Sequence, residues 1–334
     1  MIERVPTSGR NIMSNYSPLL DVLSKIKDYG GFVNSHSHLD RANTITHESM
    51  QRVNDHLFEK WRYVENVKSE SSERDYEKRI SLALESQKKM GVTKICTFID
   101  IDTVAGLRAL KAADKVKSNI AGIDLKIACQ TLDGVLDSTP KNLIEEGLSL
   151  GMIDIIGSLP GADKGKAEEH LDVIMGWAKD TGKMVHAHVD QLNISDEVET
   201  ELLAQKTIQH GLEGKVVAIH GISLACHKKE YRDRVYGLCK DAGIMFISCP
   251  SAWIDHRRTE IMSPTHSAIT PVDELLKYDI PVALGTDNIH DVYKPFCDGS
   301  MINEMRLLVD ACRVYDSSDI IRICTTNGYK ALGF

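Results

Sequence analysis

The sequence predicts an α/β fold, a TIM (β/α)8 barrel, on two observations. Short β-rich runs alternate with longer amphipathic segments, and candidate metal ligands recur where these runs end. Parallel strands need crossover connections, which helices usually supply, and eight strand–helix units close into a barrel. We expect the eight strands at residues 32–36, 95–99, 125–129, 153–157, 184–188, 216–220, 244–248 and 282–285.

The helical segments and the spacing of the strands agree with this architecture. Residues 38 and 287 enclose seven units of about 36 residues each, close to the usual ~30 with loop insertions. Helices expected over 72–90 and 167–181 stop before Gly91 and Gly182. A further helix over 17–29 has Ser17 as a cap and Pro18 in its first turn. We therefore expect residues 1–30 to be a helical extension packing on a barrel of residues 31–334.

Composition narrows the class of partner. The 334 residues are 42% hydrophobic and 26% charged, which is typical of a globular domain with a sizeable core. The net charge of -8 gives no basic footprint, which argues against nucleic acid or an anionic membrane. No long apolar run or signal-peptide pattern is present, so we expect a cytoplasmic protein with a small-molecule substrate. The eight cysteines form no CxxC pair and are expected to be reduced.

Five residues at the ends of predicted strands could hold a metal ion. His36 and His38 end the first run, and residues i and i+2 of a strand project from the same face. His188, His220 and Asp287 end later runs. A single histidine of this kind is more often a core residue, but barrel enzymes place their catalytic groups at these strand ends. Imidazoles with one carboxylate suit zinc or ferrous iron.

Several neighbouring residues leave alternatives open. His186 faces the same way as His188 and could replace it as a ligand, although His188 lies nearer the strand end. Asp190 is either a partner that fixes a histidine tautomer or a loop residue. Asn288 either reads the substrate or caps the next helix.

Two long insertions follow strands one and seven, where barrels carry their functional loops. The first spans residues 39–71, and the second runs from Cys249 through His266. From these loops we retain Trp253 and His256 as pocket candidates, because they could stack on a flat ring or pair with a carboxylate.

Together the strand-end motifs resemble a known family. His36-Ser-His38-Leu-Asp resembles the strand-one HxHLD signature of the amidohydrolase superfamily, and specifically its cytosine deaminase-like branch. The segment from His188 to Gln191 is similar to the strand-five motif of that family. Residues around His220 are similar to the strand-six motif, and those around Asp287 to the strand-eight motif. The similarity extends over nearly the whole barrel.

The resemblance implies one divalent metal ion, zinc or iron with manganese as a further candidate, and a metal-activated water. The lysine that bridges two ions in binuclear members has no counterpart at the end of strand four, residues 156–158. His220 would hydrogen-bond the water, and Asp287 would carry its proton to the leaving group. The implied ligands are His36, His38, His188 and Asp287.

This chain departs from the family pattern in three places. Gln191 stands where cytosine deaminase-like enzymes have a proton-transferring glutamate, and an amide cannot shuttle a proton near neutral pH. Leu132 aligns with the glutamine that reads the substrate. The flanking β-sandwich usual in the family is expected to be lacking. Cytosine itself is therefore not the expected substrate.

These observations predict a metal-dependent hydrolase of a non-peptide carbon–nitrogen bond, in a cyclic amide or an amino-substituted heterocycle. The predicted catalytic residues are Asp287, His220 and Gln191, and the predicted substrate-binding residues are Trp253, His256, Asn288 and Leu132. Alternatives are a cytosine deaminase-like aminohydrolase and a metal-binding protein with little or no catalysis. A phosphotriester or lactone hydrolase is disfavoured by the absent lysine. We expect a homo-oligomer, as is common for such barrels.

Overall fold

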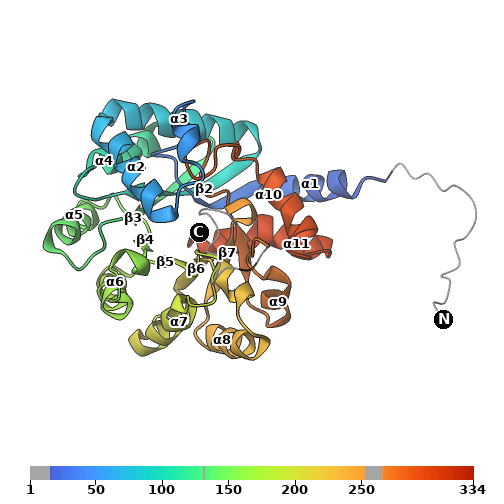
Figure 1. The fold of residues 1–334 in the computed structure, drawn as a ribbon. Coiled ribbons are helices and arrows are strands. Elements are labelled where there is room, and N and C mark those ends of the chain that lie inside the picture. The colour runs from blue at the N-terminus through green and yellow to red at the C-terminus, as the bar shows by residue number, and fades with distance from the viewer. Residues whose placement is uncertain (1–15, 131, 253–263, 265) are drawn as a thin grey trace, which may run out of the picture.

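A computed structural model describes residues 16–130, 132–252, 264 and 266–334. In this part of the chain, eight parallel strands form a TIM barrel surrounded by helices (Figure 1). Each strand overlaps a predicted run, and the largest differences are at β2, which begins at 92 rather than 95, and at β4, which begins at 156 rather than 153. The strands are β1 (Phe32–Ser37), β2 (Val92–Asp100), β3 (Asp124–Gln130), β4 (Ile156–Ser158), β5 (Val185–Val189), β6 (Val216–His220), β7 (Met245–Ser248) and β8 (Val282–Leu284).

The barrel closes through two isolated bridges. Strands β1 to β3 form one ladder and β4 to β8 another. Ala128 bridges to Ile155 between β3 and β4, and Ser37 bridges to Asp287 between β1 and the end of β8. The backbone N–H of Asp287 donates to the His36 carbonyl at 3.0 Å. The seam between first and last strands therefore runs through two of the predicted ligands.

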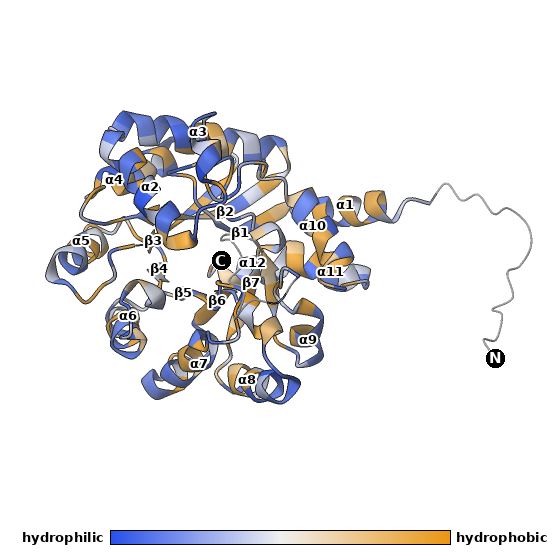
Figure 2. Ribbon diagram, in the orientation of Figure 1, coloured by the Kyte–Doolittle hydropathy of each residue, from blue (hydrophilic) through white to orange (hydrophobic). Residues whose placement is uncertain are grey.

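The helices turn one apolar side to the barrel and a hydrophilic side outward, as Figure 2 shows. The predicted helix over 167–181 matches α6, and the one over 72–90 matches α3, whose cap Ser72 accepts from Asp75 N–H. The described helices are α1 (Pro18–Asp28), α2 (Leu57–Glu70), α3 (Glu73–Lys89), α4 (Arg108–Asn119), α5 (Ser138–Ser149), α6 (Ala167–Thr181), α7 (Glu199–His210), α8 (Lys229–Asp241), α9 (Val272–Lys277), α10 (Met301–Asp310), α11 (Ser317–Cys324) and α12 (Thr326–Ala331).

The core has two layers, one between strands and helices and one inside the barrel. The inner layer includes Phe98, Ala128, Ile219 and Ala283, all fully buried. Side chains alternate along each strand, so residues two positions further toward the carboxyl ends also face inward. Inward-facing side chains therefore extend along each strand from the apolar core to the carboxyl-end rim of the barrel, where active sites lie in this fold.

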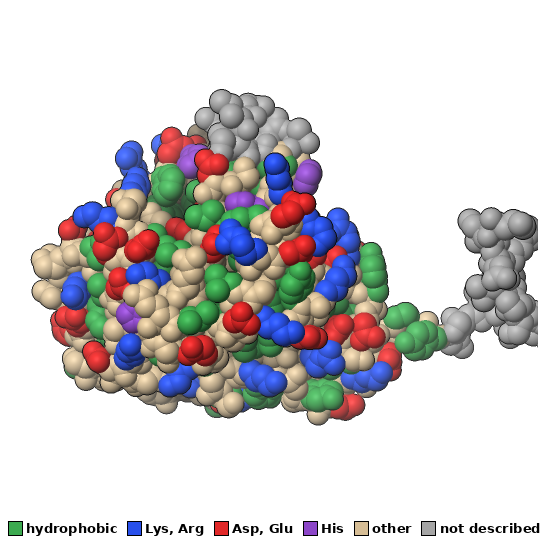
Figure 3. Space-filling view, turned by 90° about the horizontal axis from the view of Figure 1, so that it is seen from below, with side chains coloured by type: hydrophobic (Ala, Val, Ile, Leu, Met, Phe, Trp, Pro, Cys, Tyr) green, Lys and Arg blue, Asp and Glu red, His purple; other side chains and the backbone are tan. Residues whose placement is uncertain are grey.

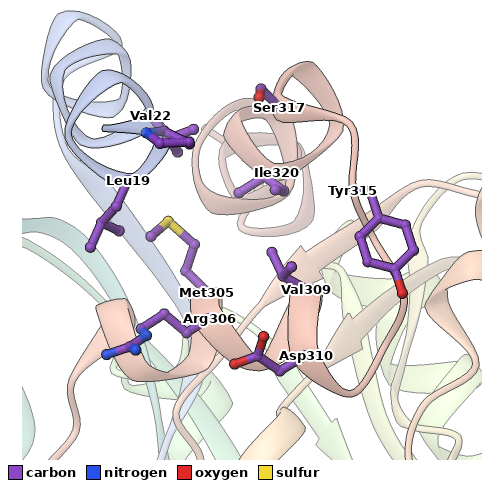
Figure 4. A pocket seen from close by; sticks show the side chains of 10 residues that line it. Leu19, Val22, Met305, Arg306, Val309, Asp310, Tyr315, Ser317 and Ile320 are labelled. Atoms are coloured by element: carbon purple, nitrogen blue, oxygen red, sulfur yellow. The ribbon is translucent and has the colours of Figure 1, made fainter. Parts of the chain in front are cut away.

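Helix α1 begins as predicted, with Ser17 accepting from Leu20 N–H and Pro18 in the first turn. Together with α10 and α11 it encloses a cavity of about 350 Å³, lined mainly by apolar side chains such as Leu19, Val22 and Met305 (Figure 4). The groups of metal-binding side chains found among the described residues lie elsewhere. No described helix is both long and apolar enough to cross a membrane.

The surface carries no field of a single sign on the face drawn in Figure 3. Basic and acidic side chains are interspersed there with small apolar areas.

Candidate metal centre

Five predicted residues meet at the carboxyl ends of β1, β5, β6 and β8. His36 Nε2 lies 3.2 Å from Asp287 Oδ1, and His38 Nε2 lies 3.3 Å from the same oxygen. The ring centroids of His36 and His188 are 4.8 Å apart, and those of His188 and His220 are 5.4 Å apart. All five side chains are buried. The strand ends thus bring together the residues that the sequence separates by up to 251 positions.

The backbone around this cluster departs from regular strand geometry. The pairing of β1 with β2 shifts register between Asn34 and Ser37, which lets His36 face inward along with Val33. His220 and Asp287 have φ values of 72° and 60°, in the left-handed region that costs a non-glycine residue of order 1–3 kcal/mol. Such strain is concentrated at functional sites, where the surrounding structure maintains it.

Glycine at position 285 is required by the close approach of His36. A Cβ at this position would lie 2.7 Å from His36 Cβ and 2.9 Å from the His36 carbonyl oxygen. Any larger residue would push β1 away from β8. Gly285 therefore sets the distance between the strand that carries two histidines and the strand that ends in Asp287.

Both ring nitrogens of His188 are available for a metal ion. Both Nδ1 and Nε2 of His188 are buried and have no hydrogen-bond partner among the described residues. Potential ligand atoms fall into two groups that share His36, one with His188 and His220 and one with His38 and Asp287, each within 4.8 Å. Buried imidazole nitrogens left without partners are rare, because their desolvation costs free energy. Their convergence beside one carboxylate fits the nitrogen and oxygen donor set of zinc or iron.

Burial sets the protonation states that a metal site needs. It lowers the pKa of His38 to about 3, with the charge of Arg41 adding to the effect. It also lowers the pKa of His188 well below its ordinary value, helped by the neighbouring His36. Burial alone would raise the pKa of Asp287, but hydrogen bonds from His36 and His38 hold it well below its usual range. At neutral pH His38 and His188 are thus neutral and the Asp287 carboxylate is ionised, as metal ligation requires.

The structure separates His188 from its competitor His186. His186 lies deeper in the barrel, and its Nε2 is 2.7 Å from the carbonyl of Ala331, near the C-terminus. It belongs to neither group of potential ligand atoms. Asp190 accepts from the N–H groups of Glu199 and Thr200, so it caps the start of α7.

A cavity of about 30 Å³ lies against the cluster. It is lined by all three predicted catalytic residues, Asp287, His220 and Gln191, and by two of the predicted substrate-binding residues, Leu132 and Asn288. Asn288 also donates to Asp291, in a turn and not in a helix cap. Trp253 and His256 lie outside the described residues.

Six residues that line the cavity were not predicted, namely Arg41, Leu57, Trp61, Gln130, Leu159 and Tyr293. Trp61, on α2, lies in the first insertion, from which the sequence analysis retained no pocket candidate. Arg41 lies in the same insertion, and Gln130 is the last residue of β3. Gln130 is the last residue of its strand, as His220 is, and His188 is one residue from the end of its strand. The search for polar residues at strand ends that identified the histidines could therefore have identified Gln130.

The floor of the site is apolar and closed. The Phe98 ring packs edge-on against His36 and His188, with both centroid distances at 4.8 Å. Beside it, a Cβ at Gly157 would lie 1.7 Å from the Cys129 carbonyl oxygen and 2.8 Å from the Phe98 ring. The inward position at the end of β4 therefore has no room for a lysine that could bridge a second ion.

Arg41 is held by a buried network of charges. Its Nη1 lies 3.2 Å from both carboxylate oxygens of Asp100, and Lys68 bonds Asp102 and lies 3.5 Å from Asp100. The Tyr293 ring centroid is 5.1 Å from the guanidinium carbon. These contacts fix a permanent positive charge in the wall of the cavity.

A buried carboxylate on α10 anchors the segment after β7. Glu304, on α10, accepts from Ser251 N–H at 3.0 Å and is 1% exposed. Burial raises its pKa to about 7, against the opposing effect of the Ser251 hydrogen bonds. At neutral pH this side chain is therefore close to the midpoint of its titration.

Comparison with known proteins places these residues in context. The model of the amidohydrolase family matches residues 30–334. An uncharacterised Haemophilus influenzae protein is 44% identical over 252 residues, 74% of this chain and 91% of that protein. The N-isopropylammelide isopropyl amidohydrolase of Pseudomonas sp. is 25% identical over 91% of this chain and 74% of its own length. The 5-methylcytosine deaminase of Klebsiella pneumoniae, solved with 5-fluorocytosine, has a TM-score of 0.83 and 25% identity over 91% of this chain and 74% of that one.

Proposed function

The chain belongs to the amidohydrolase family, and from that premise we propose its metal ligands, its catalytic residues and its substrate class. It is a metal-dependent hydrolase of a carbon–nitrogen bond outside peptides, in a cyclic amide or an amino-substituted heterocycle. The observation that carries this proposal is the cluster of four buried histidines around the ionised Asp287.

His36, His38, His188 and Asp287 hold one divalent ion, zinc or iron, with manganese as a further candidate. When bound, such an ion lowers the pKa of a water molecule toward ~7 and so supplies a nucleophile at neutral pH. These residues suit this task because burial keeps His38 and His188 neutral by lowering the pKa of each, while hydrogen bonds keep Asp287 ionised. The absence of room at Gly157 favours one ion over two.

Asp287 transfers the proton, and His220 orients the attacking water. Asp287 accepts a proton from the attacking water at a carboxylate oxygen and returns it to the leaving nitrogen. His220, turned toward the cluster by its left-handed backbone, orients the nucleophile and stabilises developing charge through its ring. Phe98 and the other apolar walls exclude bulk water and strengthen these interactions.

Gln191 restricts the class of reaction that the cavity can catalyse. Its amide lines the cavity but cannot move a proton near neutral pH. Within the described part of the cavity wall, Asp287 is the only carboxylate. One carboxylate can serve both proton transfers of an amide hydrolysis, whereas deamination of an aromatic ring also needs an acid for the ring nitrogen. This argument favours hydrolysis of a cyclic amide.

Two other functions are supported by particular observations. The likeness to 5-methylcytosine deaminase supports a cytosine deaminase-like aminohydrolase. The amide at Gln191 supports a metal-binding protein with little or no catalysis. The presence of Asp287 argues against a protein that only binds metal. A purely structural site does not need this carboxylate next to three histidines and an open coordination position.

Metal content per chain is the first test. Protein purified without added metal should contain about one zinc or iron ion per chain by elemental analysis. His188→Ala should lose this ion, and His47→Ala, which removes an exposed histidine, should keep it. A parent protein that binds no metal after reloading with zinc, iron or manganese would overturn the proposal.

Turnover is the second test. The metal-loaded protein should be screened against cyclic amides and aminated heterocycles, with ammonia release separating deamination from ring opening. Asp287→Ala should abolish turnover while preserving the fold, and Asp241→Ala, at an exposed position on α8, should not. Undiminished turnover in Asp287→Ala would contradict the mechanism.

A further inference from the structure

We propose that Gln130 and Arg41 form an acceptor–donor pair that reads the substrate. Gln130 Oε1 accepts a hydrogen bond from a ring N–H, and Arg41 donates one to the adjacent carbonyl oxygen. The inference rests on the proposed function, since it concerns the same cavity, and it specifies the substrate class as a ring with a secondary-amide edge.

Gln130 supplies the acceptor. It is 4% exposed and lines the cavity together with His188 and Asp287. Because Ala128 faces the barrel interior, Gln130 two residues later does so as well. Its Oε1 is buried and has no hydrogen-bond partner within the described ranges. A buried carbonyl oxygen left unpaired is costly, so a ligand that offers an N–H there gains the hydrogen bond at little further desolvation.

Arg41 supplies the donor. It is 6% exposed and lines the same cavity. Its Nη1 is held by the Asp100 carboxylate, whereas its Nε, 3.8 Å from Asp291 Oδ2, makes no hydrogen bond to any residue that the structure describes. A guanidinium has five donors and no acceptor and stays charged at all physiological pH values. It therefore calls for an oxygen acceptor on the ligand.

Strand pairing places the two residues on one side of the cavity. Gln130 is the register partner of Asp100, the residue that Arg41 binds. The pair therefore lies where β1, β2 and β3 end; His36 and His38 also come from the end of β1, while His188, His220 and Asp287 come from β5, β6 and β8. A ring held between the two groups would present its amide edge to Gln130 and Arg41.

The pair distinguishes an amide from an ester. A secondary amide carries an N–H donor beside a carbonyl acceptor and satisfies both residues. A ring ester carries acceptors only, so it leaves Gln130 Oε1 buried and unpaired. Sites built to hydrogen-bond a ligand N–H reject analogues without it, because the protein group loses its partner. We expect a discrimination of about tenfold from this single contact.

The test compares two ligands that differ in one group. 2-Oxazolidinone and ethylene carbonate have the same ring, except that the ring N–H of the first is an oxygen in the second. Their affinities for the zinc-loaded full-length protein can be measured by ligand-detected NMR, whether or not either is hydrolysed. The parent protein should bind 2-oxazolidinone about tenfold more tightly. Gln130→Leu should remove this preference, and Gln130→Glu, which keeps an acceptor oxygen, should retain it.

Two controls complete the experiment. Gln209→Leu, the same substitution at an exposed position of α7, should bind both ligands like the parent. Arg41→Lys should weaken both ligands alike, because the carbonyl oxygen is common to them. Zinc content and circular dichroism of each variant confirm that the site and the fold are intact.

The outcomes separate this inference from the proposed function. Equal binding of the two ligands by the parent, no binding of either, or a preference that survives in Gln130→Leu would overturn the reading pair. A preference that depends on Gln130 in a protein without turnover of any cyclic amide would support the pair and contradict the proposed hydrolysis.

Discussion

Replacing Glu304 by glutamine should stabilise the protein more at alkaline pH than at acid pH. Glu304 is buried beside the segment that follows β7 and accepts a hydrogen bond from Ser251 N–H. A glutamine side chain has nearly the same shape and can accept the same hydrogen bond through its oxygen. The substitution therefore removes the ability to ionise while leaving the packing and the anchor in place.

The magnitude follows from the raised pKa. Burial moves the pKa of Glu304 from its ordinary 4.5 to about 7, so the folded state binds this proton more tightly than the unfolded state. The stability that it contributes is complete below about pH 4.5 and is lost as the pH rises through 7. Relative to a side chain that cannot ionise, Glu304 lowers the free energy of unfolding by roughly 3 kcal/mol at pH 8 and by roughly 1 kcal/mol at pH 5. The advantage of Glu304→Gln should thus grow by about 2.5 kcal/mol over this interval.

Urea denaturation at pH 5 and pH 8 measures this difference. The free energy of unfolding is determined for the parent, for Glu304→Gln and for Glu230→Gln, which alters an exposed glutamate of α8 and should have the same small effect at both pH values. An equal effect of Glu304→Gln at both pH values would refute the reasoning. Glu304 would then ionise in the folded protein as readily as in the unfolded chain.

Three further predictions concern the barrel and its site. Asp287→Asn should bind zinc about 100-fold more weakly in a chelator competition, since four ligands share a binding free energy of roughly 10–16 kcal/mol; unchanged affinity would exclude Asp287 as a ligand. Gly157→Ala should lose roughly 1–3 kcal/mol of unfolding free energy, because its Cβ meets the Cys129 carbonyl oxygen; an unaltered urea midpoint would contradict this. Gln191→Glu should raise ammonia release from aminated heterocycles by about 100-fold, and an unchanged rate would mean that proton supply is not limiting.

The fold and the clustering of the proposed ligands were predictable because they depend on local periodicity. His36 and His38 share a face through strand alternation alone, and β-like runs ending in His188 and His220 identify the same rim of the barrel. The choice of His188 over His186 also follows from position along the strand, since only the strand end reaches the cluster. The bond of His186 to Ala331, 145 residues away, explains its presence in the core.

The remaining features depend on contacts between distant segments and have no local signal. Trp61 reaches the cavity because α2 folds back over the barrel, and a long insertion does not reveal that path in its sequence. The left-handed backbone of His220 and the requirement for glycine at position 285 arise from closure of the barrel between β1 and β8. Glu304 meets Ser251 across 53 residues. Sequence periodicity identifies which face of each element is buried, but not which partner it meets.

The number of proton carriers and the unpaired polar atoms restrict the proposed substrate in two different ways. Asp287 can move one proton from the attacking water to a leaving nitrogen, and Gln191 cannot assist it. An amide needs no more than this, because its nitrogen leaves once it has been protonated. At the ring edge that faces Gln130 and Arg41, a secondary amide places an N–H beside a carbonyl oxygen, which is the pattern that Gln130 Oε1 and Arg41 Nε would complement. A deaminase substrate would need a second proton carrier, so the supply of protons favours ring opening of a cyclic amide, while the reading pair specifies a secondary-amide edge that either class of ring can carry.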